Sequence, residues 1–188
     1  MNVTATDRPD FSQLQSGGLA RSFESCSFMD SLNVSNWDMS NVDSLRGMFN
    51  GCKALQILDV SNWDVSNITD MTNAFLNTNN INLDVTNWTT TSLSTCSRIL
   101  QLSTLFDRDL SGWDISNVTD FTFFMLTTNG LSTVNYDATL ISWASQAPNN
   151  NLSIDFGGSQ YTLGGAGETA RNTLTTTYNW TIADGGGI

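Results

Sequence analysis

A tryptophan that returns at a nearly constant interval constrains this chain more than any other feature. Trp37, Trp63, Trp88 and Trp113 recur with a period of about 25 residues, which is typical of solenoids. In a solenoid each unit buries its apolar face only by stacking on the next. The best-preserved unit is residues 60–75, which read VSNWDVSNITDMTNAF. The spacing therefore predicts four stacked units.

The residues before each tryptophan alternate between apolar and polar. An aliphatic residue lies three places before it in every unit, and a leucine lies five places before it in the first three. Alternation with period two predicts a short strand whose apolar positions face inward. In the fourth unit Arg108 takes the place of the leucine, so the pattern is broken there.

After the tryptophan the apolar spacing changes to steps of three and four. In the second unit Ile68, Met71 and Phe75 follow this spacing, and Phe49 is the equivalent of Phe75 in the first. Such steps predict one face of a short helix. Polar residues that suit a helix start come first, and we interpret them as caps. They are Asn41, Asn67 and Asn117, followed in two units by Asp70 and Asp120.

The sequence as a whole predicts three parts of the chain. We expect residues 1–10 to be a leader, 11–130 a solenoid that begins with a partial repeat, and 131–188 a capping region. In the last of these, composition and turn signals predict a helix over 136–147, a strand over 153–156, a helix over 168–177 and a strand over 180–183. The fold class is therefore predicted as α/β: a leucine-rich-repeat-like solenoid of about 25-residue strand–turn–short-helix coils, with an N-terminal half-repeat and a C-terminal α/β cap.

The repeated motif resembles a known family. Trp37, Trp63 and Trp113 are each followed by aspartate and then by Ser-Asn-Val or Ser-Asn-Ile. These motifs are similar to those of the BspA-like leucine-rich-repeat surface proteins and of mycoplasma-type repeat lipoproteins, over roughly residues 19–129. The tail resembles the region that follows such repeats in bacterial surface proteins. The resemblance implies a non-enzymatic role in adhesion or surface display.

The amino-acid composition argues against two classes of binding partner. Seven basic and 18 acidic residues give a formal net charge of −11, which disfavours nucleic acid and anionic membranes. No apolar run approaches the length of a membrane span. The first ten residues lack the features of a signal peptide. The intact Met1 favours use without secretion, and removal of an earlier signal is the alternative.

Two side-chain groups raise the question of chemistry. The chain has no histidine, so the commonest general base and metal ligand is missing. Asp38, Asp64 and Asp114 recur after the tryptophans as either an acid ladder or acceptors for turn amides; repetition at each coil favours the second. Cys26 and Cys52 occupy equivalent positions and are either a free pair or a disulfide. We predict no catalytic residue, cofactor or metal site.

The expected function is non-catalytic display of a repeat surface. The tryptophans are expected to pack rather than to offer a stacking face for sugars, and the threonines lack the register that ice binding needs. We predict a virion surface component, such as a capsid decoration or tail protein. The alternatives are a cell-surface adhesin domain that binds host protein or glycan and, more remotely, a glycan-active enzyme. The binding face is unknown, and 89–95, Arg108 and the C-terminal region are the places where the repeat is broken.

Overall fold

The computed structural model describes residues 2–3, 11–13 and 17–188. Its helices and strands are, in chain order, β1 (Asn2–Val3), β2 (Ser31–Leu32), α1 (Thr133–Ser145), β3 (Ser153–Asp155), α2 (Ala166–Thr176) and β4 (Thr181–Ala183). β1 pairs in parallel with β2. Of the predicted leader 1–10, residues 1 and 4–10 lie outside the described part of the chain.

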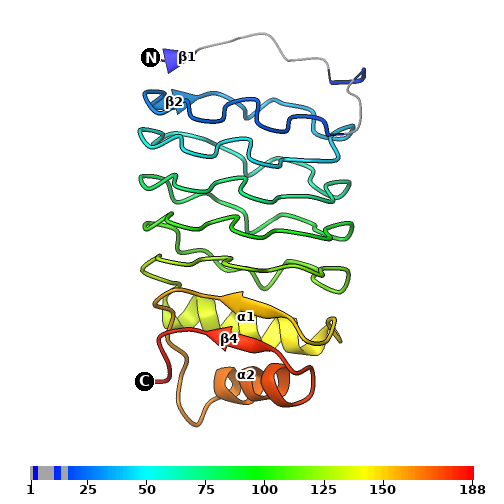
Figure 1. Cartoon of the computed structure of the whole chain (residues 1–188), viewed down its shortest axis with the longest axis vertical. Coiled ribbons are helices and arrows are strands. Elements are labelled where there is room, and N and C mark those ends of the chain that lie inside the picture. Colours follow the sequence, from blue (N-terminus) through cyan, green and yellow to red (C-terminus); the bar gives the residue numbers. More distant parts are fainter. Residues whose placement is uncertain (1, 4–10, 14–16) are drawn as a thin grey trace.

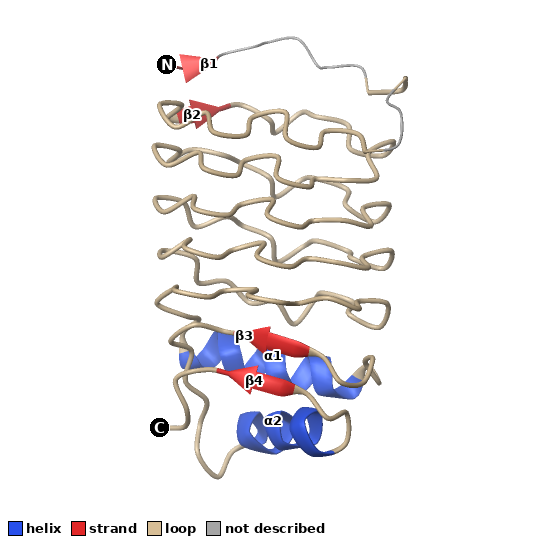
Figure 2. Cartoon of the chain, in the orientation of Figure 1, coloured by secondary structure: helices blue, strands red, loops and turns tan. Residues whose placement is uncertain are grey.

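The predicted fold class is wrong. In the described chain neither the strand nor the short helix expected in each unit is present between β2 and α1, where turns, loops and isolated β-bridges take their place. Both described helices lie in the C-terminal region, residues 131–188 (Figure 2). An α/β leucine-rich-repeat-like solenoid of strand–turn–short-helix coils therefore does not describe this molecule.

The segments between residues 17 and 130, here called the repeat region, instead form turn-rich layers that lie one above another (Figure 1). Parallel bridges connect equivalent residues of successive layers: Ser44 with Asp70, Asp70 with Thr95, and Thr95 with Asp120. Hydrogen bonds between layers follow the same register. For example, the Gly47 amide donates to the Thr72 carbonyl at 2.8 Å. The backbone is therefore satisfied mainly by the neighbouring layer.

Consecutive tight turns explain why apolar residues at steps of three and four do not form the predicted short helix. The Met48 amide donates to the Leu45 carbonyl and the Cys52 amide to the Phe49 carbonyl, which are i to i+3 bonds. Gly47 and Gly51 have positive φ angles of 62° and 76°. A left-handed residue at every fourth position ends a right-handed helix before it can extend, yet the turns still bury apolar side chains at steps of three and four.

The same left-handed positions recur in later layers. Asn73 and Asn77 have φ of 60°, and non-glycine residues follow one layer further on at Arg98 and Leu102. Asparagine and glycine tolerate this conformation best. The recurrence shows that layer stacking, rather than local preference, fixes the backbone where the residue is arginine or leucine.

The C-terminal region has the predicted order of elements. α1, β3, α2 and β4 confirm the helix–strand–helix–strand prediction, with bounds that differ by up to three residues. β3 extends the bridge system through Ile154 and Phe121 and pairs in parallel with β4. Among the described residues no helix has both the length and the apolar character needed to cross a membrane.

Candidate functional site

The four repeated tryptophans stack along the inside of the repeat region. Their ring centroids are 6.3, 6.4 and 6.0 Å apart, with nearly parallel planes. Trp63, Trp88 and Trp113 are buried, whereas Trp37 is half-buried. The Trp88 Nε1–H donates to the Val60 carbonyl of the preceding layer at 3.0 Å, and Trp63 and Trp113 make equivalent bonds. The three buried rings are core groups, each with at most 3% of its surface exposed.

Phenylalanines form a second stack beside the tryptophans. Phe49 lies between Phe23 and Phe75, with centroid distances of 5.5 and 5.7 Å. Phe75 also contacts Trp88 at 6.3 Å. Phe49 and Phe75 are buried, so these two members of the predicted ladder lie in the core.

The aspartates after the tryptophans hold turns. Asp64 Oδ1 accepts the Ser66 amide at 3.0 Å and the Ser66 hydroxyl at 2.6 Å. Asp114 accepts the same two groups of Ser116 at 2.9 and 2.6 Å, and Asp38 accepts the Ser40 amide. The serine bonds hold the pKa of Asp64 below its usual value, although the Asp38 charge opposes them. These contacts match the turn-acceptor interpretation.

A second aspartate set lies four residues before the tryptophans and was not identified from the sequence. Asp59 accepts the amide and hydroxyl of Ser61, and Asp84 those of Thr86. These bonds lower the pKa of both carboxyls. The signal was visible as Asp followed two residues later by Ser or Thr, which favours an Asx turn.

The predicted helix caps have another role, because no helix begins there. The Asn67 side-chain amide donates to the Ser40 carbonyl at 2.8 Å, and that of Asn117 to the Thr91 carbonyl at 2.9 Å. Each asparagine therefore bonds to the preceding layer. Asn41 is exposed at the equivalent place. The prediction of helix caps is therefore wrong, because the stacked layers supply carbonyl acceptors that an isolated helix start would not.

Asp70 and Asp120 likewise close turns rather than start helices. Asp70 accepts the Thr72 amide at 2.7 Å and Asp120 the Thr122 amide at 2.8 Å. Arg46 of the layer before also reaches the Asp70 carboxylate at 3.3 Å. The Arg46 contact connects the Asp70 turn to a charge in the layer before it.

The residues at two places where the repeat pattern is broken, the third unit and Arg108, also make hydrogen bonds to neighbouring layers. In the third unit the Thr90 hydroxyl donates to the Asp114 carbonyl of the next layer at 3.0 Å. Arg108 donates to the Asn82 carbonyl at 3.3 Å, while its buried Nε has no hydrogen-bond partner. Neither position gathers the set of groups that catalysis or metal binding would need.

Polar side chains on and just after α1 cover the backbone edge of the last layer. They lie at steps of three, four and three along the chain: Thr139, Ser142, Gln146 and Asn149. Gln146 is the clearest case, because its Oε1 accepts the Ile115 amide and its Nε2 donates to the Trp113 carbonyl, both at 2.8 Å. The side-chain amide thus replaces a missing backbone neighbour.

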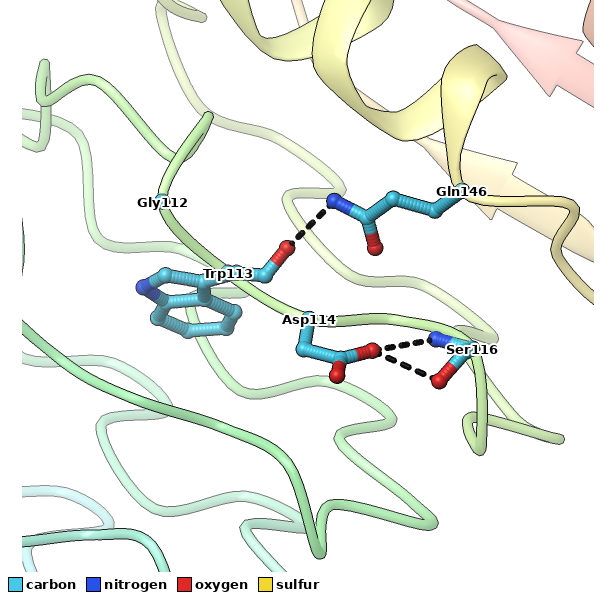
Figure 3. Close-up of a pocket in the computed structure, with 5 residues that line it drawn as sticks. All are labelled: Gly112, Trp113, Asp114, Ser116 and Gln146. Carbon is cyan, nitrogen blue, oxygen red and sulfur yellow. Dashed lines mark hydrogen bonds between the residues drawn. The ribbon is translucent and has the colours of Figure 1, made fainter.

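A hollow of about 410 Å³ opens beside this edge (Figure 3). Gly112, Trp113, Asp114, Ser116 and Gln146 line it. Gly112 is at the position where the earlier units have an asparagine. Asp114 is the charged residue of this lining, and its carboxylate accepts the Ser116 amide and hydroxyl.

A buried polar cluster stabilises the C-terminal region. Asp184, with 4% of its side chain exposed, pairs with Arg171 at 2.7 Å and accepts the Tyr136 hydroxyl at 2.7 Å. Burial and the Asp184 contact raise the pKa of Tyr136. Burial lowers the pKa of Arg171, but the bond and charge of Asp184 outweigh it and the net shift is upward. All three groups are satisfied by each other, which indicates a structural role.

A family comparison matches the model described as "Mycoplasma protein of unknown function, DUF285" to residues 18–138. The chain belongs to this family. The match supports the general form of the resemblance to mycoplasma-type repeat proteins seen in the sequence. No curated protein and no solved structure matches the chain. The match covers the repeat region and the start of α1.

Within the described residues no group of three or more Asp, Glu, Cys or His side chains could hold a metal ion. Besides the Asp59 and Asp84 set, sequence reasoning missed two groups, the Gln146 edge contacts and the Arg171–Asp184 pair. The first had a signal in the spacing of polar residues on α1. The second joins side chains from two separate elements, and no local pattern announces it.

Proposed function

We propose that this chain is a non-catalytic interaction module displayed at a surface. The observation that carries the proposal is the family match over residues 18–138, together with the resemblance of the repeated motif to those of BspA-like surface proteins. The described contacts support it, because the recurrent Asp, Asn and Ser groups are used to shape turns and join layers. A scaffold of this kind presents outward side chains in a fixed array.

The proposed role is adhesion to a protein or glycan partner, in line with the resemblance to BspA-like surface proteins. Two locations are proposed. A cell surface is the first, in line with the resemblance of the motifs to BspA-like surface proteins. A virion surface is the second location.

Location is tested by labelling with an antibody against the folded chain. Intact native cells and purified particles from the same culture are compared, with a cytoplasmic marker as control. Labelling and protease removal from intact cells support the cell surface, and enrichment in particles supports the virion. A signal that appears only after lysis contradicts display at either surface.

Contact is tested by crosslinking the full chain to its native surface and identifying the attached molecule. The hollow beside Gln146 is the first place to test within the chain. We expect Asp114→Asn to weaken binding at least about tenfold if the carboxylate contacts the ligand, which corresponds to about 1.4 kcal/mol. Asp64→Asn is a matched control, because it has the same serine bonds in an earlier layer.

The non-catalytic part of the proposal is tested separately with the same variants. Purified chain is incubated with polysaccharides, and reducing ends are counted. Turnover that disappears in Asp64→Asn or Asp114→Asn would overturn it. Binding without turnover, unaffected by either variant, supports a contact elsewhere on the repeat region.

A further inference from the structure

Cys26 and Cys52 lie at equivalent places in the turn segments 17–26 and 43–52. They are one repeat apart in the sequence, with the same spacing as the stacked pair Phe23 and Phe49. The Ser25 amide, next to Cys26, donates to the Asn50 carbonyl at 2.7 Å, so the two backbones run side by side, and a disulfide needs Cα atoms about 4.4–6.8 Å apart. The register therefore places the two cysteines at a separation that a disulfide can bridge.

Contacts of the sulfur atoms agree with this placement. The Cys52 Sγ–H donates to the Phe23 carbonyl of the neighbouring segment at 3.1 Å. The charge and the backbone amide of Cys26 both act on the Cys52 thiol. Both cysteines are free thiols. Two reduced thiols thus lie at equivalent positions of adjacent turn segments, with the Cys52 sulfur against the backbone of the segment that carries Cys26.

The two cysteines differ in their exposure to solvent. Cys26 is half-buried, whereas Cys52 is buried. Burial, with the Cys26 charge, raises the pKa of Cys52 to about 11, so this thiol is protonated at neutral pH. An oxidant from solvent therefore meets Cys26 first. Cys96 is buried at the Met71 position of a later layer, away from this pair.

We propose that Cys26 and Cys52 form a reversible disulfide that joins the first two turn segments under oxidising conditions. With oxidised glutathione, the Cys26 thiolate attacks one sulfur and releases one glutathione thiolate. Cys52 then loses its proton to solvent base and attacks the Cys26 sulfur, which breaks the mixed disulfide and releases the second glutathione thiolate. Two electrons and two protons leave the protein, and one oxidised glutathione becomes two reduced ones.

The link has a local consequence. The amides of Arg21, Phe23 and Ser25 donate to carbonyls of the segment 46–50. Opening of the segment 17–26 breaks these bonds while leaving the later layers in place. A covalent link at Cys26 limits that opening, so the reduced and oxidised chains differ mainly at this end of the repeat region.

The test equilibrates the full chain with oxidised glutathione and then analyses intact mass and peptides. We expect loss of two hydrogens, a peptide joined through Cys26 and Cys52, and amide exchange at Arg21, Phe23 and Ser25 slowed at least about tenfold. Closure rate should rise about tenfold per pH unit from about pH 7 to 9, because the Cys52 thiolate fraction grows. Dithiothreitol should reverse all three changes.

Matched variants keep the test decisive. Cys96→Ser should behave as the unmodified chain, Cys26→Ser should give neither link nor glutathione adduct at Cys52, and Cys52→Ser should stop at a Cys26–glutathione adduct. Persistence of that adduct in the unmodified chain at pH 9 overturns the proposal. A link between two chains, or one that includes Cys96, also overturns it.

Discussion

The repeat region and the C-terminal region solve the same problem of backbone hydrogen bonding in opposite ways. In the repeat region many amides donate to carbonyls of the next layer, one full repeat along the chain, so each layer needs a neighbour. In α1 and α2 the bonds are local, and side chains such as Gln146 reach across to the last layer. A stack of identical layers would end in unpaired backbone groups, and a helix with a polar face ends it.

The largest expected effect comes from the core of the repeat region. Trp88→Ala removes a fully buried ring that contacts both neighbouring layers, and it leaves the Val60 carbonyl with only the Trp63 amide as donor. We expect a loss of about 4 kcal/mol in the free energy of unfolding, measured by urea denaturation. Trp37→Ala is the control, since this ring is half-buried, and should cost clearly less. Equal losses would contradict the stacked core.

The next largest difference between the two regions is expected in the stability that their ion pairs contribute. Arg171→Ala leaves the buried Asp184 carboxylate without its cation, and we expect a loss of about 3 kcal/mol. In the repeat region Arg46 is 47% exposed in its pair with Asp70, so Arg46→Ala should cost less than about 1 kcal/mol. Thermal melts of both variants compare the two values. A larger loss for Arg46→Ala would reverse the assignment of a buried charge cluster to the C-terminal region.

The contact between the regions is tested at Gln146. Gln146→Ala leaves the Ile115 amide and the Trp113 carbonyl without side-chain partners. A loss of about 1.5 kcal/mol is expected, because half-buried backbone groups lose their bonds. Gln56→Ala removes an exposed glutamine and should change stability by less than about 0.5 kcal/mol. Urea denaturation monitored by the helix signal reports the C-terminal region, where both described helices lie.

The same contrast explains which parts of the fold could be predicted from the sequence. The four C-terminal elements were predictable, because the helix and strand signals there are local, although β3 and β4 pair with each other across α2. The repeat period and the apolar positions were also readable, and residues such as Val60, Ile68 and Met71 are buried. Each of these conclusions depends on which side chains are apolar, a property that turns and helices share.

The conformation of each unit was not predictable in the same way. Steps of three and four at Leu45, Met48, Phe49 and Cys52 fit a helix face equally well, and only φ distinguishes the two. Gly47 and Gly51 carried a warning, since glycine at every fourth position suits left-handed turns. At Arg98 the left-handed φ of 54° has no sequence signal. The neighbouring layer imposes it, and layer contacts cannot be read from one unit.

Glycine substitution should therefore have opposite signs in the two regions. Thr127 is exposed with φ of 65°, so Thr127→Gly relieves strain and should stabilise the chain by about 0.5–1 kcal/mol. Ala138 lies inside α1, and Ala138→Gly should destabilise it by about 1 kcal/mol. Melting temperatures decide the matter. The same sign in both variants would show that the left-handed turns of the repeat region store no strain.

The smallest effect is a pH dependence that belongs to the repeat region. Serine and threonine bonds lower the folded-state pKa of Asp59, Asp64 and Asp84 below the ordinary value of 3.8. A depressed folded pKa adds stability that is present above the unfolded pKa and is lost as pH falls through the folded one. The free energy of unfolding should therefore decline as pH falls below about 5.

Ser66→Ala sharpens this last test, because it removes the Ser66 hydroxyl bond to Asp64 and keeps the amide bond. The pKa of Asp64 should move toward its ordinary value, so the variant should lose less stability than the unmodified chain as pH falls from about 5 to 2. Ser145→Ala is the control, since its hydroxyl bonds a helix carbonyl in α1. Parallel curves for Ser66→Ala and the unmodified chain would mean that the turn aspartates shape the layers without contributing to their acid sensitivity.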